Sequence, residues 1–242
     1  MAESSDRATA PRPARLLIDP ETIPHDPTFD SERAGQLAVG HPHLSVGGLR
    51  ARFAAPPSWE PEVHTDSRWR TQDSPPRPAA VLVPLVATGA MVEVLLTRRT
   101  EHLHDHAGQI SFPGGRTDKG DRDAIHTALR EAEEEIGLPA AHVDILGALP
   151  EYVTGTGYRV TPVVGLIEQP VELRLDRFEV DEAFTVPLAF LMDPINHERR
   201  AIVHDGVPRR FYAMPWTAAG RRYFIWGATA AMLRNFYWML RA

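Results

Sequence analysis

The chain has 242 residues, of which 43% are apolar, and this is enough to bury one good core without requiring a second domain. It contains no cysteine, which excludes disulfides, thiolate zinc sites and cysteine nucleophiles and favours a reducing compartment, so we expect a cytoplasmic protein. A formal net charge of −6 argues against a nucleic-acid-binding surface, although a metal and local arginines could still create a site for a phosphorylated small molecule.

Residues 1–77 are predicted to form a proline-rich N-terminal arm, partly flexible, ahead of a domain at 78–242. The first 27 residues are rich in Pro, Ala, Ser and charge, and they lack the charged-then-apolar order of a secretory signal. The stretch 29–37 predicts a short helix. Seven prolines between positions 41 and 78 leave little room for regular structure, so this stretch is expected to extend over the domain or to act as a linker.

The domain is predicted to begin with a hairpin of strands 79–86 and 92–97. Pro84, Gly89 and Glu93 divide this apolar run, so it does not predict a membrane span. Strands alternating with two widely separated helices indicate an α+β fold, with a mixed sheet between helices. The remaining predicted elements are a strand at 109–112, a helix at 122–136, strands at 143–149, 160–167 and 171–175, a loop and helical turn at 180–192, a hairpin of 202–204 and 210–214 around Asp205 and Gly206, and a closing helix at 224–240.

The helix at 122–136 is the centre of the chain. Asp121 is expected to cap its N-terminus and Gly137 its C-terminus, and Pro139 forbids its continuation. At 100° per residue, four side chains form one apolar stripe that is predicted to face the core: Ile125, Leu129, Ala132 and Ile136.

Three glutamates at spacing i, i+3 and i+4 share another face of this helix, namely Glu131, Glu134 and Glu135. Like charges this close repel one another unless a cation lies among them, and Arg130 is the only nearby cation at useful spacing. The helix alone fits an acidic solvent face as well as a site for a hard divalent ion, which takes oxygen ligands and shares its remaining positions with water and phosphate. The glycine turn before it, at Gly114 and Gly115, favours the metal site, because backbone can approach a ligand closely there.

Residues 115–138 resemble a Nudix box, whose pattern is Gly, five residues, Glu, seven residues, and then Arg-Glu-apolar-x-Glu-Glu-x-Gly-apolar. The second half, from Arg130 to Leu138, matches completely, whereas Asp121 stands in place of the first Glu and eight residues follow it. The runs Leu-Leu-Thr-Arg-Arg at 95–99 and Gly-Gln-Ile-Ser-Phe-Pro-Gly-Gly at 108–115 are similar to the additional signature of the coenzyme A pyrophosphatase branch, with His104 in place of an Arg.

The resemblance implies a Nudix-type α/β/α sandwich and a Mg²⁺- or Mn²⁺-dependent hydrolase. Its substrate would be coenzyme A or acyl-CoA, cleaved into 4′-phosphopantetheine and adenosine 3′,5′-bisphosphate. The implied metal ligands are Glu131, Glu134 and Glu135, and the implied catalytic carboxylates are Glu131, Glu134 and a distal residue, for which Glu182 is preferred over Glu151. The candidates for substrate binding are Arg98, Arg99, Gly114, Gly115, Arg116 and Tyr158, the last of which could stack on an adenine. Arg130 is expected to pair with acidic neighbours, and Asp121 is one candidate.

Several alternatives stay open. The enzyme could act on another nucleoside diphosphate derivative, such as ADP-ribose or a dinucleotide, or the chain could be a non-catalytic nucleotide-binding module that signals through its N-terminal arm. His102, His104 and His106 could bind a transition metal, but the loop that carries them lacks a third anchored ligand. The C-terminal helix has more aromatic residues than one buried stripe needs, which suggests a homodimer contact.

Overall fold

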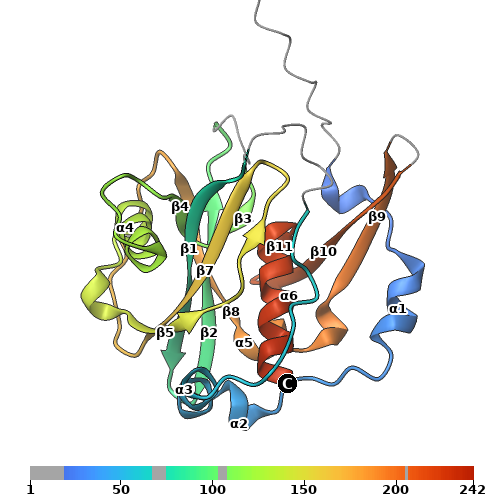
Figure 1. The fold of residues 1–242 in the computed structure, drawn as a ribbon, viewed down its shortest axis with the longest axis horizontal. Helices are drawn as coiled ribbons and strands as arrows, with labels where there is room; N and C mark the ends of the chain where they lie inside the picture. Colours follow the sequence, from blue (N-terminus) through green and yellow to red (C-terminus); the bar gives the residue numbers. More distant parts are fainter. Residues whose placement is uncertain (1–18, 67–74, 103–107, 205–206) are drawn as a thin grey trace, which may run out of the picture.

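The computed structural model of the protein describes residues 19–66, 75–102, 108–204 and 207–242. A large mixed β-sheet lies between helix α4 (Ala124–Ile136) on one side and helix α6 (Ala228–Arg241) on the other (Figure 1). A smaller three-stranded sheet lies on the α6 side. The predicted α+β sandwich of helices on a mixed sheet is therefore confirmed.

Within the described residues the large sheet has the strand order β3-β2-β1-β7-β5, with β4 beside β1, β6 beside β7 and β8 beside β2. Strands β1 and β7 run parallel, and the other pairs are antiparallel. The strands are β1 (Arg77–Thr88), β2 (Met91–Arg99), β3 (Ile110–Ser111), β4 (Gly114–Arg116), β5 (Asp144–Ala148), β6 (Tyr152–Val153), β7 (Tyr158–Ile167) and β8 (Val180–Pro187).

Two predictions about this sheet were wrong. Strand β8 occupies a stretch that was expected to be a loop, followed by the short helix α5 (Leu188–Leu191) that was expected. Residues 171–175 are not a strand, although Val171, Leu173 and Leu175 alternate as in one. These three side chains pack against the core under α4, and the Arg174 N–H donates to the Ile136 carbonyl at 2.9 Å. Their alternation reflects packing over the helix end rather than pairing in the sheet.

The smaller sheet has the order β11-β10-β9 and comprises β9 (Glu198–His204), β10 (Val207–Ala218) and β11 (Arg221–Trp226). Pairing of β9 with β10 confirms the predicted hairpin, whose turn residues Asp205 and Gly206 lie outside the described residues. The closing helix starts later than predicted, at Ala228, because the residues before it pair with β10 and Gly227 then turns the chain with a φ of 64°. Apolar residues at 224–226 fit either period, so the pattern could not separate strand from helix.

Helix α4 ends as predicted and begins slightly differently. Gly137 ends it in the left-handed region with a φ of 65°, but the N-cap is Asp123, whose carboxylate accepts the His126 N–H at 2.8 Å. The predicted cap, Asp121, lies outside the helix. The apolar stripe is also rotated, because Ile125 is 39% exposed. The buried residues of the helix are Thr127, Ala128, Ala132, Glu135 and Ile136. Small residues at 128 and 132 allow the helix to pack closely against the sheet, and this rotation also buries Glu135.

The N-terminal region is more ordered than its prolines suggested. A short 3-10 helix, η1 (Pro20–Thr22), and three α-helices occupy it in the described residues: α1 (Pro27–Arg33), α2 (His41–Leu44) and α3 (Val46–Ala54). The prediction that residues 41–78 lack regular structure was therefore wrong. Prolines stand in the first turn of α1 and of α2, where a missing N–H costs nothing, and so do not prevent either helix.

Side chains of α6 fix this region to the core. Arg234 is fully buried and donates to Glu62 at 2.7 Å and to Gln36 at 2.7 Å. The Tyr237 hydroxyl donates to the Leu37 carbonyl at 2.9 Å, and the Trp238 indole N–H donates to Glu62. The N-terminal region thus covers the extra aromatic residues of the helix, and a homodimer contact stays a prediction without that support. No helix of the described residues is long and apolar enough to cross a membrane.

We propose that residues 19–66 belong to the same folded unit as the domain, which the substitution Leu49→Ala would test. Leu49 is fully buried in the core beneath α3, so we expect a loss of about 2–3 kcal/mol of unfolding free energy from the cavity. That corresponds to a melting temperature lower by roughly 6 °C. Leu37→Ala is the matched control, because its side chain is 61% exposed and should change stability by less than about 0.5 kcal/mol. Equal melting temperatures for the two variants would mean that this region does not contribute to the fold.

Candidate active site

An ion pair between Asp121 and Arg130 joins the turn after β4 to helix α4. The Arg130 guanidinium donates to both carboxylate oxygens of Asp121, at 3.0 and 2.9 Å, and to the Arg116 carbonyl at 3.1 Å. Asp121 also accepts from His126, Thr127 and the Asp118 N–H. The hydrogen bonds from Arg130 hold the pKa of Asp121 well below its usual range. Sequence reasoning named this pair correctly but misplaced Asp121 as the helix cap.

The Glu131 carboxylate lies directly against the backbone of the glycine turn. A Cβ atom added to Gly115 would lie 2.6 Å from that carboxylate, so only glycine leaves this space open. An Arg130 nitrogen lies 3.0 Å from a Glu131 carboxylate oxygen. Burial nevertheless raises the pKa of Glu131 above its usual value, and the charges of Glu134 and Glu179 raise it further. Glu131 is therefore a half-buried acid with less positive charge near it than it requires.

Glu135 is the most buried of the helix glutamates, with a side chain 6% exposed. It accepts the Gly114 N–H at 3.2 Å, and an Arg99 nitrogen lies 3.7 Å from its carboxylate. Gly114 has a φ of 154°, and a side chain there would meet the β1 backbone at 2.5 Å. Burial raises the pKa of Glu135 to about 8, and the charges of Glu131 and Glu179 add to the effect. The site thus contains a second acid that its protein partners do not neutralise.

Glu179 is a site residue that sequence reasoning missed. It lies on the turn before β8, its carboxylate is 4.0 Å from Arg99, and its charge raises the pKa of both Glu131 and Glu135. Nothing local in the sequence marks it, because the neighbouring Asp181 and Glu182 are equally acidic. Only the pairing of β8 with β2 brings this turn beside α4.

Glu134 is arranged differently from the other two helix glutamates. Its side chain is 60% exposed, and it accepts from Arg130 at 2.9 Å, so the guanidinium lies between Glu131 and Glu134. Within the part of the chain that is described, no three His, Cys, Asp or Glu side chains are arranged to hold a metal ion together. The predicted ligand set of Glu131, Glu134 and Glu135 accordingly stays a prediction. The donor chemistry fits a hard ion: two inward carboxylates with raised pKa values, a third nearby, and no sulfur or imidazole donor among them.

Arg98 and Glu182 lie on the opposite face of the large sheet from the glutamates of α4. Glu182 lies 2.9 Å from Arg98 and 3.0 Å from Arg221, and it accepts the Tyr223 hydroxyl at 3.0 Å. Tyr223 is part of the core on the α6 side. Successive side chains of β2 point to opposite faces of the sheet, so the neighbouring Arg99 lies on the α4 side, toward Glu135. The structure therefore brings Arg99 into the site but does not bring Arg98 or Glu182 there.

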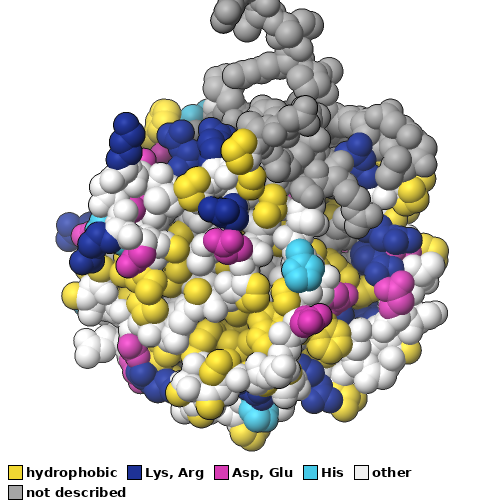
Figure 2. Space-filling model, in the orientation of Figure 1, with side chains coloured by type: hydrophobic (Ala, Val, Ile, Leu, Met, Phe, Trp, Pro, Cys, Tyr) yellow, Lys and Arg dark blue, Asp and Glu magenta, His cyan; other side chains and the backbone are white. Residues whose placement is uncertain are grey.

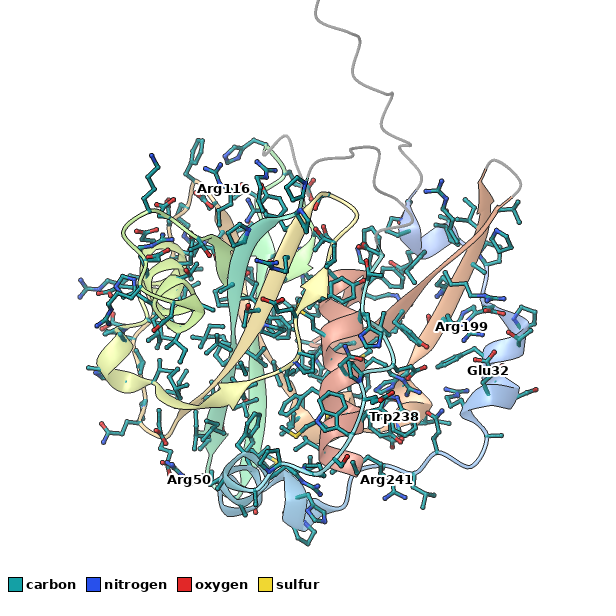
Figure 3. All side chains as sticks on the ribbon, in the orientation of Figure 1. Glu32, Arg50, Arg116, Arg199, Trp238 and Arg241 are labelled. Atoms are coloured by element: carbon teal, nitrogen blue, oxygen red, sulfur yellow. The ribbon has the colours of Figure 1, made fainter. Side chains whose placement is uncertain are left out.

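The other predicted site residues are spread around the sheet. Tyr158 is half-buried beneath the Arg77 guanidinium, whose Cζ lies 4.4 Å from the ring centroid. Glu151 lies 3.5 Å from Arg159 and not with the helix glutamates. His104 and His106 lie outside the described residues. Lys and Arg side chains gather on the upper left of the molecule, above α4 (Figure 2), and Arg116 lies at that edge (Figure 3). This local positive charge suits a phosphorylated ligand despite the net negative charge of the chain.

Two surface cavities lie elsewhere. One of about 270 Å³ is lined by residues of α1 and β9, and the other, of about 420 Å³, lies between α3, β5 and α6. Neither is lined by Glu131 or Glu135. The first is lined by mutually paired ions such as Asp26 and Arg199, whereas Glu131 and Glu135 have too little positive charge near them, as their raised pKa values show. Charge therefore locates the candidate active site better than cavity shape does.

The substitution Gly115→Ala would test how closely the glycine turn positions Glu131. The new methyl group would meet the carboxylate, which can rotate away, so we expect little change in melting temperature but about tenfold lower turnover. Gly120→Ala is the matched control, because a Cβ there meets nothing within 4 Å. Full activity in Gly115→Ala would show that the position of the Glu131 carboxylate is not important for the reaction.

Comparison with known proteins supports the motif. Residues 75–205 match the family model of the NUDIX domain. The chain is 42% identical over 159 residues to a protein of Escherichia coli (strain K12) named Uncharacterized Nudix hydrolase NudL. The aligned residues make up 66% of this chain and 80% of that relative. A protein of the same name from Shigella boydii serotype 18 is 41% identical over 159 residues, with the same coverage.

Solved structures resemble the chain more distantly. A binary complex of a C. elegans Ap4A hydrolase is 22% identical with a TM-score of 0.40, covering 46% of this chain and 80% of that one. The Nudix hydrolase RenU from M. smegmatis is 25% identical with a TM-score of 0.41, and the match covers 48% of this chain and 73% of RenU. These TM-scores are too low to bear on the function of the chain.

Proposed function

The chain belongs to the Nudix family of pyrophosphohydrolases, and from this premise we propose that its substrate is coenzyme A or an acyl-CoA. The products would be 4′-phosphopantetheine and adenosine 3′,5′-bisphosphate. The observation that carries the proposal is the pair of inward carboxylates, Glu131 and Glu135, lying against the backbone of Gly114 and Gly115. The run from 95 to 115, which resembles the signature of the coenzyme A branch, supports this substrate over other nucleoside diphosphate derivatives.

Glu131 and Glu135 are the residues that we propose to hold Mg²⁺ or Mn²⁺, with Glu134 and Glu179 close enough to contribute. Their raised pKa values reflect burial without a matching positive charge, and a divalent cation would supply that charge. A bound ion of this kind neutralises a diphosphate and acidifies the water it holds. Carboxylates, water and phosphate oxygens are its preferred ligands.

The chain's own residues would position the substrate and accept a proton. We propose that a Glu131 carboxylate oxygen accepts the proton of the attacking water, because this side chain is half-buried, has a raised pKa and lies against the glycine turn. Glu134 is the second candidate for this role. Arg99 and Arg116 would bind the phosphates, and the glycine turn would leave room for them. We do not propose Glu182 as the base, nor Arg98 as a phosphate ligand, because their charges are already paired on the other face of the sheet.

The experiment that tests the substrate is hydrolysis of coenzyme A beside ADP-ribose, with and without Mg²⁺, and with both products identified by mass. Coenzyme A should have the higher kcat/KM, and its products should have the masses of 4′-phosphopantetheine and adenosine 3′,5′-bisphosphate. Dephospho-coenzyme A is the matched control, because it lacks only the 3′-phosphate. Preference for ADP-ribose or for dephospho-coenzyme A would overturn the coenzyme A assignment while leaving pyrophosphate hydrolysis intact.

A further inference from the structure

An aromatic side chain stands in solvent beside the candidate active site. Phe178 is 65% exposed, although the turn that carries it is firmly held. Its N–H donates to the Asp176 carboxylate at 2.9 Å, and its carbonyl accepts the Thr100 hydroxyl at 2.8 Å. The Asp176 N–H in turn donates to the Glu135 carbonyl at 2.9 Å, at the end of α4. The turn is therefore tied both to β2 and to the helix that bears the glutamates.

A second ring meets Phe178 from a distant part of the chain. The His102 imidazole, three residues beyond the end of β2, has its centroid 4.9 Å from that of Phe178, with 58° between the ring planes. Both side chains are exposed. Single exposed apolar residues are common and require no explanation. The two rings, one on the fixed turn and one from the segment after β2, together form a surface on which a third ring can pack.

The aromatic pair adjoins the acidic site. Glu179 follows Phe178 directly, and its carboxylate lies 4.0 Å from Arg99, which is 3.7 Å from Glu135. A nucleoside diphosphate derivative has its base separated from the phosphates by one ribose. A ligand with its diphosphate near Glu135 and Arg99 would therefore have its base within reach of Phe178.

We propose that Phe178 and His102 form the surface on which the nucleobase of the substrate stacks. This inference rests on the proposed function, because it places the diphosphate at Glu131 and Glu135. Aromatic side chains bind bases through stacking that tolerates different base identities, so the pair supplies affinity for the nucleotide half of the substrate. Phe178 is a binding residue in this arrangement and takes no part in the chemistry.

The first test compares Phe178→Ala with Phe178→Tyr in steady-state hydrolysis of a nucleoside diphosphate derivative. The alanine variant should have about tenfold higher KM, equivalent to about 1.4 kcal/mol, with kcat within about twofold of the unchanged protein. The tyrosine variant should keep the original KM. Met91→Ala is the matched control, because Met91 is 58% exposed at the opposite end of β2. A KM that is the same in all three variants would overturn the inference.

The second test measures binding without turnover. Phe178→Trp places a fluorescent ring on the turn, whose emission AMP should quench and ribose 5-phosphate, which lacks only the base, should not. Equal responses to the two ligands would overturn the inference even if hydrolysis is normal. Quenching by AMP alone, in a protein that hydrolyses no nucleoside diphosphate derivative, would support the base site and contradict the proposed function. The two proposals can therefore fail separately.

Discussion

Replacing Glu131 by Gln is expected to lower kcat for metal-dependent pyrophosphate hydrolysis by about 100-fold or more, and Glu135→Gln should have an effect of similar size. Both substitutions keep the shape of the side chain and remove the charge that would hold a divalent ion. Glu133→Gln is the matched control, because Glu133 lies on the same helix with an exposed side chain. Initial rates at saturating Mg²⁺ would measure the effect. Unchanged turnover in Glu131→Gln would mean that α4 is not the catalytic element.

Melting temperatures show whether Glu135→Gln loses activity because the site has changed or because the protein has unfolded. Burial raises the folded-state pKa of Glu135 to about 8 from an ordinary value of 4.5, so unfolding releases a proton between these values. In metal-free protein the stability associated with this group is complete below about pH 4.5 and decreases as the pH rises toward 8. Glu135→Gln cannot ionise, so at pH 8 it should melt no lower than the unchanged protein. Added Mg²⁺ should raise the melting temperature of the unchanged protein more than that of the variant.

Replacing Asp121 by Asn is expected to remove about 3 kcal/mol of unfolding free energy, at the lower end of the range for breaking a buried ion pair because Arg130 is 22% exposed. The melting temperature should decrease by roughly 10 °C. Asp121 accepts from four other residues, so the substitution removes the negative charge that pairs with Arg130 and replaces one acceptor oxygen by an NH2 donor that faces other donors. Asp118→Asn is the matched control, because the Asp118 side chain is exposed and only its N–H reaches Asp121. Equal melting temperatures for the two variants would contradict this account.

The same ion pair predicts a pH dependence with a defined sign. Arg130 lowers the folded-state pKa of Asp121 below its unfolded value. The stabilisation is therefore present above the unfolded pKa of about 4 and is lost as the pH decreases below it. Melting temperatures measured between pH 6 and pH 3 should decrease more steeply for the unchanged protein than for Asp121→Asn. Parallel curves would mean that the pair does not contribute to acid stability.

Short-range sequence patterns were sufficient to predict the end of helix α4 and the hairpin that begins the domain. The left-handed conformation at Gly137 and the barrier at Pro139 fix the end of α4, and the hairpin of β1 and β2 follows from apolar runs around a glycine turn. The spacing of Glu131 and Glu135 puts both on one helix face whatever surrounds it. The pairing of Arg130 with acidic neighbours, with Asp121 as one candidate, could also be named in advance, because an arginine this close to several carboxylates has partners whatever the fold.

The tertiary structure decided which side chains face the candidate active site and which of them lie close to Glu131 and Glu135. Arg98 and Arg99 are neighbours on β2, so the alternation of the strand sends them to opposite faces of the sheet, but which of them meets the glutamates depends on which face α4 covers. Glu179 and Glu182 are similar in sequence, but strand pairing places only Glu179 beside the glutamates of α4. The N-terminal region is ordered because Leu49 and the partners of Arg234 are buried against distant elements, which proline counts cannot reveal.

The sequence by itself therefore determined helix α4, its C-terminal end and the shared face of Glu131 and Glu135, because these depend on interactions a few residues long. The tertiary structure alone decided which other charges and rings surround those carboxylates. Strand register and helix rotation set that choice, and both are fixed by how the whole core packs rather than by any short stretch of the chain.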